Sequence, residues 1–232
     1  MNMKKYELTE ETMSFYGKTL HRVKALCDFG KVKAGDLGGW IEHGGNLDHE
    51  GACWVYNNAR VFDNARVWDN AQIFNNAVIR GNARICSNAR VSDDVWVSGD
   101  SQVHGTARVM GSARISDNAL VYGHANVCDN ANIYGYAVIS GRAHIGGNVK
   151  ICDRTHIRKH AAILSISDFL YFKGLGYTDT GITAYKCKGG DIQITFGAFS
   201  GTVDEFRELV KNAKYIKEYL AAIELIKVHF GI

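Results

Sequence analysis

A six-residue repeat fills the chain between Val61 and Ile163. Every sixth residue in this interval is Val or Ile, which makes 18 consecutive hexads without an insertion. The fifth position of the hexad is Ala in 13 of the 18, and the third is Asp, Asn or Gly in 15 of the 18. A helix needs a period of 3.6 residues and a strand needs a period of 2, so neither element alone explains the pattern.

Six residues are enough for a short strand followed by a turn. The β-branched residue points inward while its two neighbours point outward. Asp, Asn and Gly tolerate left-handed backbone conformations, so the third position predicts a corner, and Ala fits the crowded interior beside it. Repeated in this way, the hexads predict a solenoid whose coils bury a continuous core.

The template [VI]-x-[DNG]-x-A-x resembles that of the hexapeptide-repeat, left-handed parallel β-helix family. In that family three hexads form one coil of 18 residues. The resemblance implies an all-β solenoid of about six coils, which at about 4.8 Å per coil is on the order of 29 Å long.

The sequences on both sides of the repeat predict caps, which the exposed ends of a solenoid require. The expected domains are an N-terminal β cap (1–46), the β-helix (47–165) and a C-terminal α+β domain (166–232). MSFYGKTLHRVKAL predicts a hairpin, and GDLGGW, which begins at Gly35, predicts a tight turn. A capping box of Thr202 and Glu205, followed by apolar positions through Phe230, predicts one C-terminal helix.

A more specific resemblance covers nearly the whole chain. The segments KYELT, GDLGGWIE and NLDHEG, the N-A-R-V hexads and the tail FGAFSGTVDEF are similar to those of a group of phage and prophage proteins. Members of that group are labelled acyltransferases or left unnamed, so the resemblance implies an architecture more firmly than an activity. Many members have Cys-Gly-Cys-Phe where this chain has Phe196 to Phe199, so no thiol role is transferred.

Composition argues against several classes of partner. The net charge is +3 and 46% of residues are hydrophobic, which does not favour nucleic acid or a membrane surface. No stretch approaches 18 apolar residues, and the N-terminus lacks the apolar core of a signal peptide. Six scattered cysteines without a CxxC pair suit reduced thiols. We therefore expect a cytoplasmic protein, in the host cytoplasm if it is phage-encoded.

Acyl transfer is the activity that the family resemblance raises, with acetyl-CoA as cosubstrate. In such enzymes a loop usually interrupts the hexads, and a His acts as general base. The 18 hexads of this chain are uninterrupted, so we predict no catalytic residue and favour a binding protein over an enzyme. A carbonic anhydrase built on the same prism needs three converging His. No stretch matches that class, so we predict no metal and no resident cofactor.

Stacking at 18-residue intervals predicts one edge of the prism rich in His and Arg. The predicted ligand-binding residues on this edge are His104, Arg108, Tyr122, His124, Arg142, His144, Arg158 and His160. The span 142–160 holds five Lys or Arg and one Asp, which gives 5 − 1 = +4. Arg forks suit phosphate and aromatic rings suit a base, so a small anionic, nucleotide-like ligand is expected. Alternatively, this coil is solvated or faces tail carboxylates, namely Asp168, Asp204, Glu205 and Glu208.

Large aromatic side chains gather at the N-terminal end of the repeat. The candidate interface residues are Trp54, Phe62, Trp68 and Phe74. Rings on the outside of a coil seldom stay bare, so either the N-terminal cap folds over them or they form a subunit interface. The family resemblance implies a homo-oligomer, with a trimer favoured.

These observations lead to three hypotheses about function. The first is a non-catalytic, phage-associated protein that sequesters a small anionic ligand or blocks a host defence protein. The second is an acyl-CoA-dependent acyltransferase. The third is a structural spacer that separates the two caps.

Overall fold

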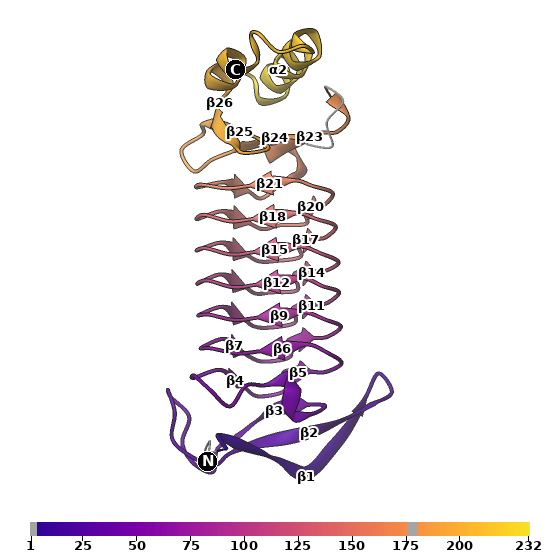
Figure 1. The fold of residues 1–232 in the computed structure, drawn as a ribbon, viewed down its shortest axis with the longest axis vertical. Helices are drawn as coiled ribbons and strands as arrows, with labels where there is room; N and C mark the ends of the chain where they lie inside the picture. The colour runs from indigo at the N-terminus through magenta and orange to yellow at the C-terminus, as the bar shows by residue number, and fades with distance from the viewer. Residues whose placement is uncertain (1–3, 176–180) are drawn as a thin grey trace.

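A computed structural model describes residues 4–175 and 181–232 of the chain. Figure 1 shows a straight column of stacked coils, with a β-hairpin at its N-terminal end and a small sheet with two helices at its C-terminal end. The column is a left-handed parallel β-solenoid of about seven coils, which confirms the predicted fold class.

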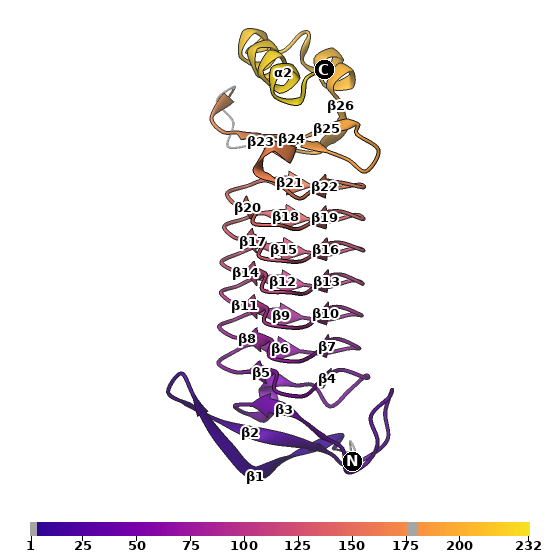
Figure 2. The ribbon, with the colours of Figure 1, turned by 180° about the vertical axis from the view of Figure 1, so that it is seen from behind.

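Three sheets form the sides of the prism, and Figure 2 shows their strands stacked from coil to coil. The nine-stranded sheet contains β1 (Tyr6–Phe15), β2 (Lys18–Ala25), β3 (Leu37–Ile41), β5 (Arg60–Val61), β8 (Val78–Ile79), β11 (Trp96–Val97), β14 (Arg114–Ile115), β17 (Asn132–Ile133) and β20 (Lys150–Ile151). The seven-stranded sheet contains β4 (Trp54–Val55), β7 (Gln72–Ile73), β10 (Arg90–Val91), β13 (Arg108–Val109), β16 (Asn126–Val127), β19 (His144–Ile145) and β22 (Ala162–Ile163). The six-stranded sheet contains β6 (Arg66–Val67), β9 (Arg84–Ile85), β12 (Gln102–Val103), β15 (Leu120–Val121), β18 (Val138–Ile139) and β21 (His156–Ile157).

Successive coils pair in parallel at an offset of 18 residues. Arg90 lies opposite Arg108, and Arg108 lies opposite Asn126. The Val and Ile residues of the hexads and the Ala residues at their corners are buried along the whole column. The predicted core and the predicted register are therefore confirmed.

The corners adopt the left-handed conformation that the third hexad position predicts. Asp, Asn and Gly at this position have positive φ, and so do two of the three exceptions, Ser87 (59°) and Lys159 (56°). The third exception, Ser165, follows the last coil strand and has φ −138°. Several corner carboxylates also accept a hydrogen bond from the coil above. Asp117 Oδ2, for example, lies 3.0 Å from the backbone nitrogen of Gly135. Asp at a corner thus serves both the turn and the stacking of coils.

The solenoid begins one coil before the first hexad. Strand β3 pairs in parallel with β5, and Leu47 bridges to Val67, so the segment before β4 forms two sides of an additional coil. Only Gly35 of GDLGGW is in a turn conformation, at φ +93°, because the segment from Leu37 belongs to β3. The tight turn predicted for the whole motif is therefore wrong. The division at residues 46 and 165 stays a prediction.

Close packing explains why β3 departs from the hexad pattern. A Cβ on Gly39 would lie 2.5 Å from the carbonyl oxygen of Ala59, and one on Gly38 would lie 2.6 Å from that of Val55. Glycine therefore lets β3 approach the next coil where a hexad would have used a side chain. A short 3₁₀ helix (Gly44–Asn46) follows β3 and leads into Leu47.

The hairpin β1–β2 covers part of the aromatic surface. Phe62 is buried against Phe15, with ring centroids 5.8 Å apart, and Trp54 is buried within the chain beside Phe29. Of the two alternatives, the N-terminal cap folding over the rings therefore holds for Trp54 and Phe62. Trp68 is half-buried, as is Phe74, which stacks on Tyr56 at 4.5 Å.

The C-terminal part packs two helices on a small antiparallel sheet. After a 3₁₀ helix (Ile166–Asp168), the sheet contains β23 (Phe169–Phe172), β24 (Ile182–Lys186), β25 (Ile192–Phe196) and β26 (Phe199–Thr202). Helix α1 (Val203–Val210) begins at the predicted capping box, and helix α2 (Ile216–Phe230) follows.

The prediction of one C-terminal helix is wrong. A continuous helix over 203–230 would extend about 42 Å. The five-residue strands beneath it span only about 17 Å. The break at 211–215 lets Phe206 of α1 and Ile223 of α2 share one core with Ile194 of β25.

We expect substitution of corner glycines to separate backbone strain from close packing. Gly99 has φ +68°, and an added Cβ would lie 2.7 Å from the backbone of Asp117, whereas Gly17 has φ +75° and open space around it. Gly17→Ala should cost about 1–2 kcal/mol of unfolding free energy from strain alone. Gly99→Ala should cost about 1–3 kcal/mol more from overpacking. Urea unfolding measures both, and equal losses would contradict the packing of the coils.

Acid should weaken the hydrogen bonds that corner carboxylates accept, and Asp93 allows this effect to be measured. Its carboxylate accepts hydrogen bonds from Gly111 N (3.0 Å) and Asn75 Nδ2 (2.8 Å). The bond from Gly111 is the main cause that lowers the pKa of Asp93. A lowered folded-state pKa gives stability that is present above the unfolded value of about 3.9 and is lost as pH falls below it.

The wild-type chain should therefore have a higher free energy of unfolding than Asp93→Asn at neutral pH, and this difference should disappear by about pH 3. The measurement is the urea midpoint of both proteins at each pH. Asp94→Asn is the matched control, because Asp94 accepts only a side-chain amide, that of Asn76, within the described residues. A pH-independent difference for Asp93→Asn would contradict this role.

Candidate ligand-binding site

The predicted His/Arg edge lies at the corner between the six-stranded and seven-stranded sheets. The 18-residue register stacks its residues in three neighbouring columns, as the sequence predicts. Of the eight predicted residues, the structure brings Arg108 and His124 into one shallow cavity. This cavity has a volume of about 390 Å³ and is lined by Thr106, Arg108, His124, Ala125 and Asn126. We call it the edge cavity.

A hydrogen bond fixes the orientation of His124. Thr106 Oγ1 lies 3.0 Å from the carbonyl oxygen of Gly123 and 2.6 Å from His124 Nδ1. A carbonyl oxygen can only accept, so the Thr106 hydroxyl donates to it and accepts from the Nδ1–H of His124. The other ring nitrogen, Nε2, belongs to an exposed side chain.

Asn126 contributes an acceptor that has no partner. Its Oδ1 is buried and makes no hydrogen bond. Buried polar atoms without a partner are rare, because losing the bond to water costs about 1–3 kcal/mol. Asn126 is also one of the residues that line the edge cavity.

An aromatic pair lies on the column next to the edge cavity. The rings of His104 and Tyr122 stack with centroids 5.1 Å apart and an angle of 12° between their planes. Burial lowers the pKa of His104, so its ring is neutral near pH 7. His104 therefore adds an aromatic surface to the edge, and not a positive charge.

The remaining predicted residues do not join the edge cavity. Arg142 is exposed one coil beyond His124, and His144 Nε2 lies 4.0 Å from Cys128 Sγ. The C-terminal sheet contacts the last coil: the backbone nitrogen of Arg158 donates to the Tyr185 hydroxyl, and the carbonyl oxygen of His160 accepts from Lys188 N. The C-terminal sheet thus partly shields Arg158 from ligands in solution.

Most of the tail carboxylates have other partners. Asp168 pairs with Lys186 at 3.3 Å, and Glu208 pairs with Lys211 at 2.6 Å. Glu205 accepts from Thr202 N as part of the capping box. In the last coil, Lys159 bonds to a neutral group, Gln193, whose Oε1 lies 2.6 Å from Lys159 Nζ.

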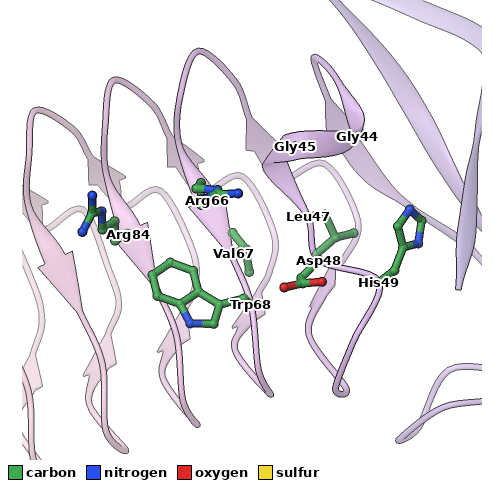
Figure 3. Close-up of a pocket in the computed structure, with 9 residues that line it drawn as sticks. All are labelled: Gly44, Gly45, Leu47, Asp48, His49, Arg66, Val67, Trp68 and Arg84. Carbon is green, nitrogen blue, oxygen red and sulfur yellow. The ribbon is translucent and has the colours of Figure 1, made fainter. Parts of the chain in front are cut away.

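A larger cavity at the N-terminal end was missed by the sequence analysis. It has a volume of about 470 Å³ and is lined by Gly44, Gly45, Leu47, Asp48, His49, Arg66, Val67, Trp68 and Arg84. Figure 3 shows Arg66, Arg84 and Trp68 on neighbouring coils, with Asp48 on the coil before them. The 18-residue spacing of Arg66 and Arg84 could have indicated it. The contribution of 44–49 could not, because that segment lies outside the hexads.

Other classes of site have no support in the described ranges. Within residues 4–175 and 181–232, no group of three or more His, Cys, Asp or Glu side chains could hold a metal ion. No helix in the same ranges is long and apolar enough to cross a membrane. All six cysteines are free.

Comparison with known proteins supports the repeat class. A family model described as the YdcK Beta solenoid repeat matches residues 83–99, 89–105 and 113–127. A curated protein from Escherichia coli (strain K12), named "Uncharacterized acetyltransferase YdcK", is 38% identical over an alignment of 63 residues, and the match covers 24% of this chain. The chain covers 19% of that relative's length. The central coils of this chain therefore contain β-solenoid repeats of the hexapeptide type.

Proposed function

We propose that the chain is a binding protein that holds a small anionic ligand in the edge cavity. The observation that supports this best is the unpartnered Oδ1 of Asn126 beside the exposed guanidinium of Arg108. A cation and an empty acceptor in one cavity suit a ligand that combines an anionic group with an N–H or O–H donor.

A nucleotide-like ligand fits the chemistry of the surrounding edge. Its phosphate would bind Arg108, an N–H or O–H would donate to Asn126, and Arg142 on the corner above would add positive charge. The stacked rings of His104 and Tyr122 offer an aromatic surface on the neighbouring column. In this proposal the protein sequesters the ligand without turnover, as a phage-associated protein acting on a host signal would do.

The test compares two arginines in the same column of the seven-stranded sheet. Arg108 lines the edge cavity, whereas Arg90 lies directly opposite it one coil earlier and does not line the cavity. Isothermal titration of the ribonucleotides, used as probes, should show binding that is about 10- to 100-fold weaker in Arg108→Gln. Arg90→Gln should stay within about twofold of wild type. Equal effects of the two variants would contradict the edge cavity as the site.

The variant Asn126→Val distinguishes a role of Asn126 in ligand binding from a role in stability. Removing the buried, unpartnered acceptor should leave the unfolding free energy unchanged or raise it, because no internal bond is lost. The same change should weaken probe binding. Loss of stability without loss of binding would assign Asn126 a structural role and count against the proposal.

Acyl transfer is a second candidate, favoured by the orientation of His124. With Nδ1–H held by Thr106, Nε2 could take the proton of an acceptor hydroxyl or amine while the acceptor attacks the acetyl-CoA thioester. The C–S bond then breaks, and the imidazolium could return the proton to the departing CoA thiolate. The name of the E. coli relative points to the same chemistry.

Release of CoA thiol from acetyl-CoA separates the two candidates. With amine and hydroxyl acceptors present, we expect wild-type protein to release no more thiol than the protein-free control. Release that falls about 10²- to 10⁴-fold in His124→Gln would replace the binding proposal with acyl transfer.

A further inference from the structure

The cavity at the N-terminal end has its own set of ligand-binding groups. Its walls come from the additional first coil and from strands β6 and β9, and it shares no lining residue with the edge cavity. We call it the N-terminal cavity. An inference about it therefore does not depend on the function proposed above.

Two arginines supply the positive charge of the N-terminal cavity. Arg66 and Arg84 lie opposite each other on paired strands, which are about 4.8 Å apart. Both side chains are exposed, and neither makes an ion pair with another described residue. Two unneutralised guanidinium groups on adjacent strands repel each other, and one phosphate dianion could pair with both.

Trp68 supplies an aromatic surface next to the arginines. Its indole follows directly after β6 and is half-exposed, and Figure 3 shows it between Arg84 and Asp48. Planar bases stack on aromatic rings, and such stacking contributes to the affinity of proteins for nucleotides. The cavity thus places a ring-binding group beside a phosphate-binding pair.

Asp48 and His49 supply an acceptor and a neutral donor. Asp48 Oδ1 accepts from Glu50 N at 3.0 Å, which fixes the loop and leaves Oδ2 for a hydroxyl or amino group. His49 Nδ1 accepts from Lys5 N at 3.2 Å, and its ring stacks on Tyr6. Burial lowers the pKa of His49, so the ring is neutral and its proton is on Nε2.

The charges and polar groups that line the N-terminal cavity favour a phosphate monoester as its ligand. Arg66 and Arg84 contribute +2 and Asp48 contributes −1, so the lining has a net charge of +1 with His49 neutral. A simple inorganic anion would use the arginines but leave Trp68 and Asp48 without a role. A ligand with a phosphate, a planar ring and hydroxyl or amino donors uses all of them.

We propose that the N-terminal cavity binds a nucleoside monophosphate. The phosphate lies between Arg66 and Arg84, the base stacks on Trp68, and Asp48 accepts from a hydroxyl or amino group. The cavity is a second, separate site on the solenoid, at the end where the hexads meet the N-terminal cap.

Calorimetric titration of the full chain tests this proposal. The probes are the four ribonucleoside monophosphates, with adenosine and inorganic phosphate as partial ligands, all at one low salt concentration. At least one monophosphate should bind, and both partial ligands should bind more weakly. The double variant Arg66→Gln/Arg84→Gln should weaken that binding by at least about tenfold.

Matched variants keep the test specific. Arg114 occupies the same strand position on the nine-stranded sheet and does not line the cavity, so Arg114→Gln should bind as wild type. Trp68→Leu should weaken binding about tenfold, and Trp68→Phe should restore most of it, because Phe keeps a stacking ring. Urea midpoints near that of wild type would show that the variants are folded.

Three outcomes would overturn the proposal. The first is the absence of binding by any monophosphate at millimolar concentration. The second is equal binding of inorganic phosphate and the monophosphates, which would mean an anion site without a base. The third is sensitivity to Arg108→Gln in place of Arg66→Gln/Arg84→Gln, which would assign the binding to the edge cavity.

Discussion

The hydrogen-bond ladder between coils is the interaction on which the rest of the molecule depends. Each strand from β4 to β22 is only two residues long, so none of them is stable without the coils on either side. The ladder joins a backbone nitrogen to the carbonyl oxygen 17 residues later, as in Arg108 N to Ala125 O at 2.9 Å. Because the offset never changes between Val61 and Ile163, outward side chains form straight columns.

Both cavities are consequences of these columns. In the edge cavity, Thr106 lies under His124 and Arg108 lies beside Asn126, each pair separated by 18 residues. In the N-terminal cavity the same offset pairs Arg66 with Arg84. Along the regular coils, a ligand site depends on which side chains the register places together. Where the register ends, the segment at residues 44–49 closes a larger space.

The regular part of the molecule could be predicted from the sequence because three of the six hexad positions each favour one class of residue. The buried Val and Ile, the interior Ala and the left-handed corners all follow from that pattern. The first coil could not be predicted, because β3 uses Gly38 and Gly39 where the hexad uses side chains. The two C-terminal helices were predicted as one, because the apolar spacing continues through the break that the small sheet imposes.

For the candidate site, the sequence predicted which residues the 18-residue register places together, but not how their side chains interact. The columns placed Arg108 and His124 at one edge, but they do not reveal the hydrogen bond from His124 to Thr106 or the unpartnered Oδ1 of Asn126. Those depend on side-chain conformations that no spacing rule contains. The neutral state of His104 depends on burial, and the cover over Arg158 depends on the C-terminal sheet.

The central claim is that the 18-residue columns build anion-binding cavities. Crystals grown with 8-bromoadenosine 5′-monophosphate test this claim most directly. Anomalous scattering locates the bromine and electron density locates the phosphate. We predict phosphate density within hydrogen-bond distance of Arg108 in the edge cavity or of Arg66 and Arg84 in the N-terminal cavity. Ordered water alone in both cavities, or bromine only at surfaces outside them, would contradict the account.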